Sequence, residues 1–177
     1  KDIYEKALTY RSNWDAALNN IGAHVTNGGT ISAKEDGSAF IGSEHNDTFE
    51  SQNGKIEGSI YLGKGNDTLT LKGTDITKVT VLEGSYKGNP DALDKTESNI
   101  LILNQELTGN SEGQGTYEDK SIRNFKRIVV GEGNTGTFNV TGNMVSKSGA
   151  IGDLEIGQGS TLNIVAPKGG NPADIRL

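Results

Sequence analysis

Two acidic turns are the segments of this sequence best suited to chemistry. Asn46-Asp47-Thr48-Phe49 and Asn66-Asp67-Thr68-Leu69 are nearly identical tetrads that lie 20 residues apart. Two carboxylates stacked on one face could act as acid and base in the cleavage of a polysaccharide. Carboxylates and turn carbonyls could instead bind calcium. In a third interpretation, the Asn and Asp side chains bond the local backbone and form a ladder between successive turns.

Calcium binding would require more copies of the turn than the sequence holds. Gly63–Leu69 resembles the calcium-binding nonapeptide of RTX β-rolls, in which ligands converge from consecutive turns. Leu62 stands where that pattern has its first Gly, and the poorer copy at residues 43–47 lies 20 residues away rather than nine. We therefore expect no metal site and no cofactor, with a calcium-stabilised β-roll kept as an alternative.

Catalytic side chains are also scarce. His24 and His45 are the only histidines, and no Gly-x-Ser-x-Gly motif occurs to supply a nucleophile. No two Asp residues are adjacent, although clustered Asp residues are typical of pectin-cleaving enzymes. We expect no catalytic residues and no enzyme activity. The alternative is an exported carbohydrate-active enzyme of β-helix fold that uses Asp47 and Asp67.

Composition limits the partners and the compartment. The chain has 177 residues, 32% of them hydrophobic, with 25 Gly, no Cys and a net charge of −6. A negative chain with scattered basic residues is a poor partner for nucleic acid or for anionic membranes. The lack of Cys excludes disulfides and zinc–thiolate sites. No apolar run approaches the length of a membrane span, so we expect no direct membrane insertion.

The chain begins with one helical pattern and then changes character. Apolar residues recur with a helical period from Asp2 to Ile21, with Asp2 as the N-cap and Gly22 just beyond the C-terminus. We expect residues 1–24 to form a helix that caps the domain that follows. Its apolar face would cover the first layer through Trp14, Leu18 and Ile21. From residue 25 onward the chain reads as all-β.

A repeated unit predicts the fold of residues 25–177. The pattern apolar–x–apolar–Gly–x–Gly, followed by a second short strand, begins at Ile60, Ile128 and Leu154. Glycines at such a turn allow a sharp corner with positive φ. Coils of 20 or more residues would stack the two Asn-Asp tetrads directly. We therefore predict an all-β, right-handed parallel β-helix (a solenoid), with a β-sandwich as the chief structural alternative.

Alternation along the strands predicts which side chains fill the tube. Residues expected to point inward are Ile60, Leu62, Leu69 and Leu71, and residues expected to point outward are Tyr61, Thr68 and Thr70.

Parts of the sequence resemble a known family. Gly58–Leu71 and Gly152–Leu162 resemble the degenerate repeat of type V autotransporter passenger domains, and Asn134–Val140 resembles in style the large fusobacterial outer-membrane adhesins. The resemblance implies a piece of a secreted, virulence-associated protein at the bacterial cell surface, anchored through an outer-membrane barrel outside this sequence. It implies adhesion to host or bacterial cells, through a surface protein or glycan, or a purely structural stalk.

Two insertions interrupt the repeat and are the expected contact surfaces. They span residues 84–99 and 109–121, and loops on a rigid scaffold commonly carry recognition. Tyr is a favourable contact residue because it offers a large area at a small entropy cost. The candidate binding residues are Tyr86, Asn89, Asp91, Tyr117, Glu118 and Asp119. An insertion that is tolerated without any partner is the alternative.

Overall fold

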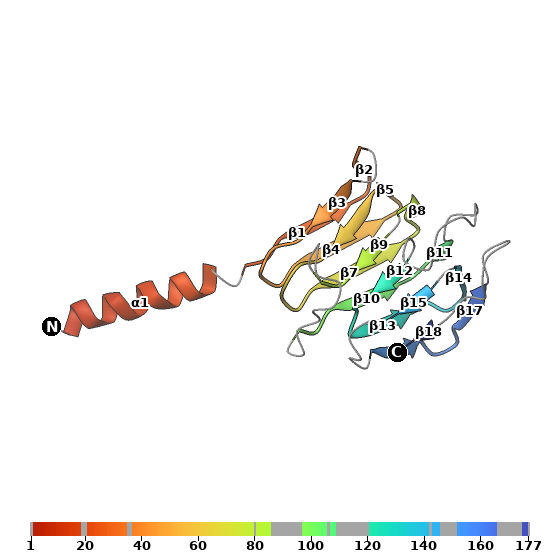
Figure 1. Cartoon of the computed structure of the whole chain (residues 1–177). Coiled ribbons are helices and arrows are strands. Elements are labelled where there is room, and N and C mark those ends of the chain that lie inside the picture. The colour runs from red at the N-terminus through yellow and green to blue at the C-terminus, as the bar shows by residue number, and fades with distance from the viewer. Residues whose placement is uncertain are drawn as a thin grey trace.

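Four parallel sheets form three sides around one core in the computed structural model of the chain (Figure 1). The structure describes residues 2–18, 21–34, 37–79, 81–85, 97–105, 107–108, 121–141, 143–145, 152–165 and 175–176. The first side of the tube consists of β1 (His24–Asn27), β4 (Thr48–Gln52), β7 (Thr68–Lys72), β10 (Ile100–Leu103), β13 (Arg127–Val130) and β16 (Asp153–Ile156).

The second side is made of two three-stranded sheets, and the third side is again six-stranded. The second side contains β2 (Thr30–Ser32), β5 (Lys55–Glu57) and β8 (Asp75–Lys78), then β11 (Leu107–Thr108), β14 (Thr137–Thr141) and β17 (Thr161–Val165). The third side contains β3 (Ser38–Ile41), β6 (Ser59–Tyr61), β9 (Val81–Glu83), β12 (Ser121–Arg123), β15 (Asn143–Val145) and β18 (Ile175–Arg176). Each consecutive strand triplet forms one coil, so the strands from β1 to β18 make six coils.

The strand register confirms the predicted parallel β-helix. Every strand pair in the described part of the chain is parallel, which a β-sandwich built from hairpins would not be. The two tetrads stack as predicted, with Thr48 opposite Thr68 and Phe49 opposite Leu69.

The repeated Gly-x-Gly motif does not mark a single side of the tube. Ile60 lies in β6 on the third side, whereas Ile128 and Leu154 lie in β13 and β16 on the first side. The neighbours of Ile60 in the sheet are Phe40 and Leu82. The motif could not identify the side because every sharp corner favours a Gly with positive φ: Gly63 has φ 99° and Gly131, at a different corner, has φ 78°.

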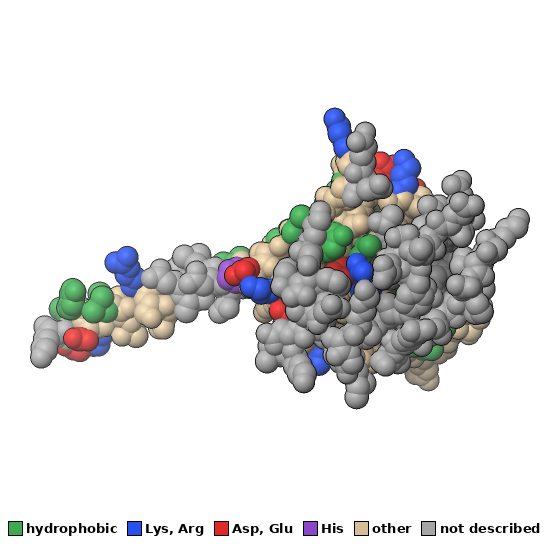
Figure 2. Space-filling model, in the orientation of Figure 1, with side chains coloured by type: hydrophobic (Ala, Val, Ile, Leu, Met, Phe, Trp, Pro, Cys, Tyr) green, Lys and Arg blue, Asp and Glu red, His purple; other side chains and the backbone are tan. Residues whose placement is uncertain are grey.

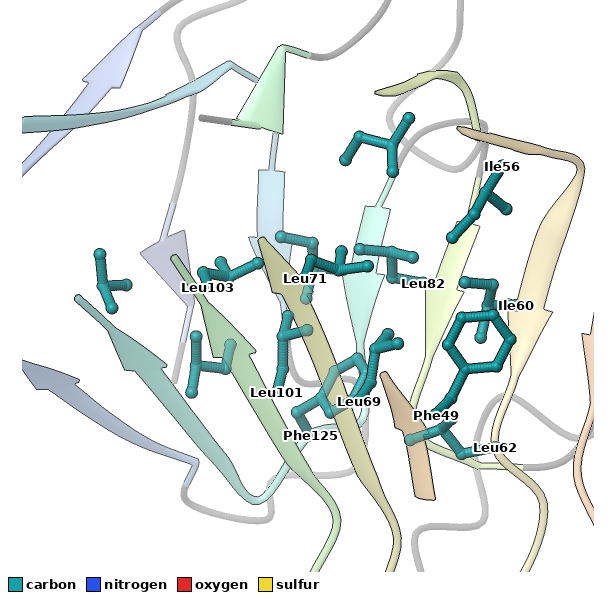
Figure 3. Close-up of a cluster of buried hydrophobic side chains, with 14 of the residues drawn as sticks. Phe49, Ile56, Ile60, Leu62, Leu69, Leu71, Leu82, Leu101, Leu103 and Phe125 are labelled. Carbon is teal, nitrogen blue, oxygen red and sulfur yellow. The ribbon is translucent and has the colours of Figure 1, made fainter. Parts of the chain in front are cut away.

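The apolar core runs along the inside of the tube (Figure 3). The residues predicted to point inward (Ile60, Leu62, Leu69 and Leu71) are all 0% exposed, and those predicted to point outward (Tyr61, Thr68 and Thr70) are half-buried. Phe49 stacks edge-on against Phe40, with ring centroids 5.0 Å apart, and so joins the first side to the third. One continuous core therefore connects the coils.

The predicted N-terminal helix is present as α1 (Asp2–Leu18), with Asp2 and Glu5 in its first turn. It is described as far as Leu18, Ile21 lies outside it, and it extends away from the first coil (Figure 1 and Figure 2). Ile21, expected to pack in the cap, is 66% exposed, while the side chains of Trp14 and Leu18 lie outside the described part of the structure. Capping of the solenoid by α1 stays a prediction.

Candidate functional site

The two Asn-Asp tetrads form a polar site at the corner that leads from the third side into the first. We call this site the Asx corner; its residues are Asn46, Asp47, Asn66, Asp67, Ser98 and Asn99. It has an inner row of side chains turned toward the core and an outer row exposed to solvent. Each row joins successive coils by side chain to backbone hydrogen bonds.

The inner row is a buried ladder of acceptors. The N–H of Asp47 donates to Asp67 Oδ1 at 2.7 Å, and the N–H of Asp67 donates to Asn99 Oδ1 at 2.9 Å. The N–H of Ala23 donates in the same way to Asp47 Oδ1. Asp47 is 1% exposed, and Asp67 and Asn99 are 0% exposed. The interpretation of these turns as a backbone-bonding ladder is confirmed.

The inward orientation of the Asp47 and Asp67 carboxylates argues against the carbohydrate-cleavage hypothesis. Asp47 and Asp67 do stack, as that hypothesis requires, but both are turned into the tube and held by backbone N–H groups. A general acid or base must reach the bond it cleaves within hydrogen-bonding distance. Buried carboxylates at this corner do not meet that requirement for a polymer on the outer surface.

The carboxyl group of Asp67 is buried and has a raised pKa. Its Oδ2 is buried and has no hydrogen-bond partner in the described part of the chain. Burial raises the pKa of the Asp67 carboxyl to about 7, the N–H of Asp47 opposes the rise, and the carboxylates of Asp47 and Glu97 add to it. Asp67 therefore changes protonation state close to neutral pH.

The same geometry weakens the calcium alternative. Calcium requires several oxygen ligands arranged around one point, whereas Asp67 Oδ1 is taken by the backbone of Asp47. Among the described residues, no three His, Cys, Asp or Glu side chains gather in a way that would hold a metal ion.

The outer row of the Asx corner repeats the ladder in solvent. Asn46 Oδ1 accepts the N–H of Asn66 at 2.9 Å, and Asn66 Oδ1 accepts the N–H of Ser98 at 2.9 Å. Both hydrogen bonds are exposed to solvent, and water can replace either partner. Each bond therefore contributes little to the free energy of unfolding.

Loss of one outer acceptor should have a small, measurable cost. We expect Asn46→Ala to lower the free energy of unfolding by about 0.5–1 kcal/mol, because the N–H of Asn66 loses its partner but remains hydrated. The matched control is Asn163→Ala, which removes an exposed amide that donates to the side chain of Asn139 at 3.1 Å. Urea denaturation of both variants measures the difference. Equal stabilities would mean that the outer row does not hold the coils together.

A second buried polar cluster surrounds Glu83 on the third side. Glu83 shares an outward position with Tyr61, yet it is 1% exposed. Its Oε1 accepts from the Asn124 amide at 2.7 Å and the Ser85 hydroxyl at 3.0 Å, and its Oε2 lies 3.2 Å from Arg123 Nε. Burial raises the pKa of Glu83, against the opposing effects of Asn124, Arg123 and Ser85. The cluster links Glu83 of β9, in the third coil, to Arg123 and Asn124 in the fourth coil.

A third polar stack lies inside the corner between the first and second sides. The Asn27 amide donates to Ser51 Oγ at 3.0 Å, and the Thr74 hydroxyl donates to the same oxygen at 2.9 Å. Gln105 pairs with the backbone of Thr74 through both its amide oxygen and its amide nitrogen. Sequence reasoning missed this stack; its signal is one polar residue at or close to the end of each of the first four first-side strands.

The predicted binding residues are not placed by the structure. Tyr86, Asn89, Asp91, Tyr117, Glu118 and Asp119 all lie outside the described residues. Gly84 and Ser85 at the start of the first insertion, and Asn99 at its end, are described. The insertion therefore leaves and re-enters the solenoid next to both the Glu83 cluster and the Asx corner.

The structure describes both histidines that were weighed above. His24 begins β1 and is exposed. His45 is half-buried in the Asx-corner turn, where its backbone N–H donates to Ser43 Oγ at 3.0 Å.

Compared with models of known protein families, with curated proteins and with solved structures, the chain shows no match. Within the described residues, no helix is both long and apolar enough to span a membrane.

Proposed function

We propose that the chain is a segment of a secreted bacterial surface adhesin of the autotransporter passenger class. In this proposal the solenoid is a rigid stalk and the insertions at residues 84–99 and 109–121 are the contact surfaces. The partner is a protein or glycan on a host or bacterial cell.

The observation that carries the proposal is the six-coil stack with its shared core and its cross-coil polar ladders. A stack of this kind extends by adding coils, so it makes an elongated rod without needing a larger core. Segments inserted at a corner change the length of a coil without disturbing its neighbours. The first insertion does so: Asp67 and Asn99 are adjacent rungs although 32 residues separate them, against 20 between Asp47 and Asp67.

Surface chemistry also supports a scaffold. The outward face of the second side carries paired charges: Glu57 is bound by Lys55 of its own strand at 2.8 Å and, across the coils, by Lys78 of β8 at 2.9 Å. Such exposed pairs contribute little free energy each but favour one register between coils. They give the face a mixed-charge, hydrated character suited to a stalk.

Cell-binding measurements with loop variants test the proposal. The 177-residue chain is labelled and titrated onto host cells, bacterial cells and a glycan array, beside two variants in which residues 86–96 or 109–120 are replaced by a short Gly-Ser linker. We expect at least one replacement to weaken binding by more than about tenfold, because Tyr side chains concentrate binding energy. Tyr86→Ser and Tyr117→Ser then localise the effect, with Tyr10→Ser on α1 as the matched control.

Two results would contradict the proposal. Unchanged binding after both replacements would remove the loops as contact surfaces. Turnover of a polysaccharide by the intact chain would replace adhesion with catalysis.

A further inference from the structure

The two carboxyl groups in the inner row of the Asx corner differ in the number of donors that bind them. Asp47 accepts the N–H groups of Ala23 and Ser43 and the hydroxyl of Ser43, the last at 2.9 Å. Asp67 accepts the N–H of Asp47 at 2.7 Å, and its Oδ2 has no hydrogen-bond partner in the described part of the chain. Because a buried charge needs hydrogen bonds, Asp67 is the less suited of the two to carry a negative charge.

Gly63 is the reason for this difference. It stands four residues before Asp67, where Ser43 stands four residues before Asp47. Gly63 has no hydroxyl to offer, and its N–H donates to the carbonyl of Ser85 in the following coil at 3.3 Å. Its φ is 99°, and a Cβ at this position would lie 2.2 Å from the carbonyl oxygen of Ser43, so the fold does not accept a Ser here. The turn therefore leaves Asp67 short of donors.

Among the described residues, the charged groups that face Asp67 from the neighbouring coils are negative. Asp47 lies on one side and Glu97 on the other, and both disfavour the ionised form of Asp67. The basic residue of the same turn, Lys64, is paired with Glu44 at 2.8 Å on the outer surface. Ionisation of Asp67 therefore adds a charge to a corner that is already negative.

Asp67 is also bonded to the residues that begin the next coil. Its N–H donates to Asn99 Oδ1 at 2.9 Å, and the amide nitrogen of Asn99 donates to the carbonyl of Gly84. We call these two hydrogen bonds of Asn99 the clasp. Beside it, the N–H of Gly65 donates to Glu97 Oε1 at 3.4 Å. Gly84 precedes the first insertion and Glu97 follows it, so the clasp holds the two ends of that insertion together.

We propose that ionisation of Asp67 opens the clasp, so that this corner is a pH-sensitive switch, closed in acid and loosened at neutral pH and above. Opening lets water reach Asp67 Oδ2, which the closed corner excludes. The preceding coil yields less easily, because three donors hold Asp47 there. The residues that move are therefore Glu97, Ser98 and Asn99, and the two ends of the first insertion are then no longer held together. The switch requires no binding partner, so it is independent of adhesion.

The direction of the switch follows from the pKa of Asp67, which the closed corner raises from 3.8 to about 7. A raised carboxyl pKa means that the protonated form favours the closed state. The contribution of Asp67 to closure is therefore fully present below about pH 4, is lost as pH rises to about 7, and is level above that.

Two other groups near the clasp can titrate and must be separated from Asp67. Glu83 has a raised pKa and accepts the hydroxyl of Ser85, next to Gly84; its partner Arg123 stays charged throughout. His45 lies in the preceding turn of the Asx corner, and His side chains commonly change charge between about pH 5 and 8. Variants that remove one titrating group at a time distinguish these sources.

Hydrogen exchange of single amides, followed by NMR and corrected for the intrinsic exchange rate at each pH, tests the proposal. The amide of Asp67 is bonded to Asn99, and its protection should be lower at pH 7.5 than at pH 5 by more than about tenfold. The amide of Asp47 is the matched control, because it donates to Asp67 Oδ1 and keeps that acceptor when the clasp opens. Unchanged protection at Asp67, or an equal fall at Asp47, would overturn the proposal.

Asp67→Asn keeps the acceptor oxygen but cannot ionise, so protection of the amide at this position should no longer depend on pH. His45→Gln should keep the fall seen in the natural chain. A fall that persists in Asp67→Asn would assign it to His45 or Glu83 and overturn the proposal. A second measurement needs no variant: the carbon-13 shift of the Asp67 carboxyl in the natural chain should titrate with a midpoint near pH 7, and a midpoint below about pH 5 would also overturn the proposal.

Discussion

Truncation of Leu101 to Ala should lower the free energy of unfolding by about 3 kcal/mol, within the range of 2–5 kcal/mol typical of buried Leu→Ala changes. Leu101 is 0% exposed and lies between Leu69 and Ile128 in the inward column of the first side. Its loss leaves a cavity that touches the coils on both sides. Chemical denaturation followed by circular dichroism measures the change.

The matched control for Leu101→Ala is Thr70→Ala, one coil away. Thr70 stands on the outward face of β7, opposite Ile102, and is half-buried. A surface substitution of this kind should change the free energy of unfolding by no more than about 0.5 kcal/mol. Equal losses for the two variants would mean that Leu101 does not face a closed core, and the tube arrangement would be wrong.

Replacement of Asp67 by Asn should stabilise the protein at pH 8 by about 2 kcal/mol. The rise of the Asp67 pKa from 3.8 to about 7 corresponds to roughly 4 kcal/mol against the ionised form. Asn keeps the oxygen that accepts the N–H of Asp47, and Asn99 already fills the same position in the next coil. The new amide N–H groups need partners of their own, which reduces the gain.

The gain from Asp67→Asn should depend on pH in a defined direction. Because the folded state raises the pKa of Asp67, its protonated form favours folding. The contribution of Asp67 to stability is fully present below about pH 4, is lost as pH rises to about 7, and is level above that. The difference in unfolding free energy between the variant and the natural chain should therefore grow from pH 4 to 7.

Glu50→Gln is the control for this pH dependence. It also removes one carboxylate, from an exposed position on β4. Glu50→Gln should change the free energy of unfolding by no more than about 0.5 kcal/mol across the same pH range. A difference for Asp67→Asn that does not change with pH would show that Asp67 is not a buried, titrating member of the Asx corner.

The register of the tetrads was predictable because local chemistry and coil length agree. Asn and Asp followed by Thr and an apolar residue mark a turn that enters a strand, and two such turns 20 residues apart fit one coil. Inward and outward positions around Ile60 and Leu69 followed from alternation alone.

Other features were not predictable because their signals are ambiguous. Gly-x-Gly marks a sharp corner, and a three-sided tube has three corners in each coil, so the motif alone does not show that Ile60 and Ile128 lie on different sides. Glu83 sits at an outward position, where a charged residue normally indicates solvent, and its burial depends on partners 40 and 41 residues away, Arg123 and Asn124. Buried Ser51 and Thr74 read in sequence as ordinary turn residues.

A crystal structure of the chain tests the central claim most directly, since that claim is one tube of parallel coils. The account predicts coils that rise by about 4.8 Å each, with Thr48 beside Thr68 and the side chains of Leu69, Leu101 and Ile128 stacked in one column. Antiparallel neighbours at β4 and β7, or Leu69 and Ile128 in separate cores, would contradict it.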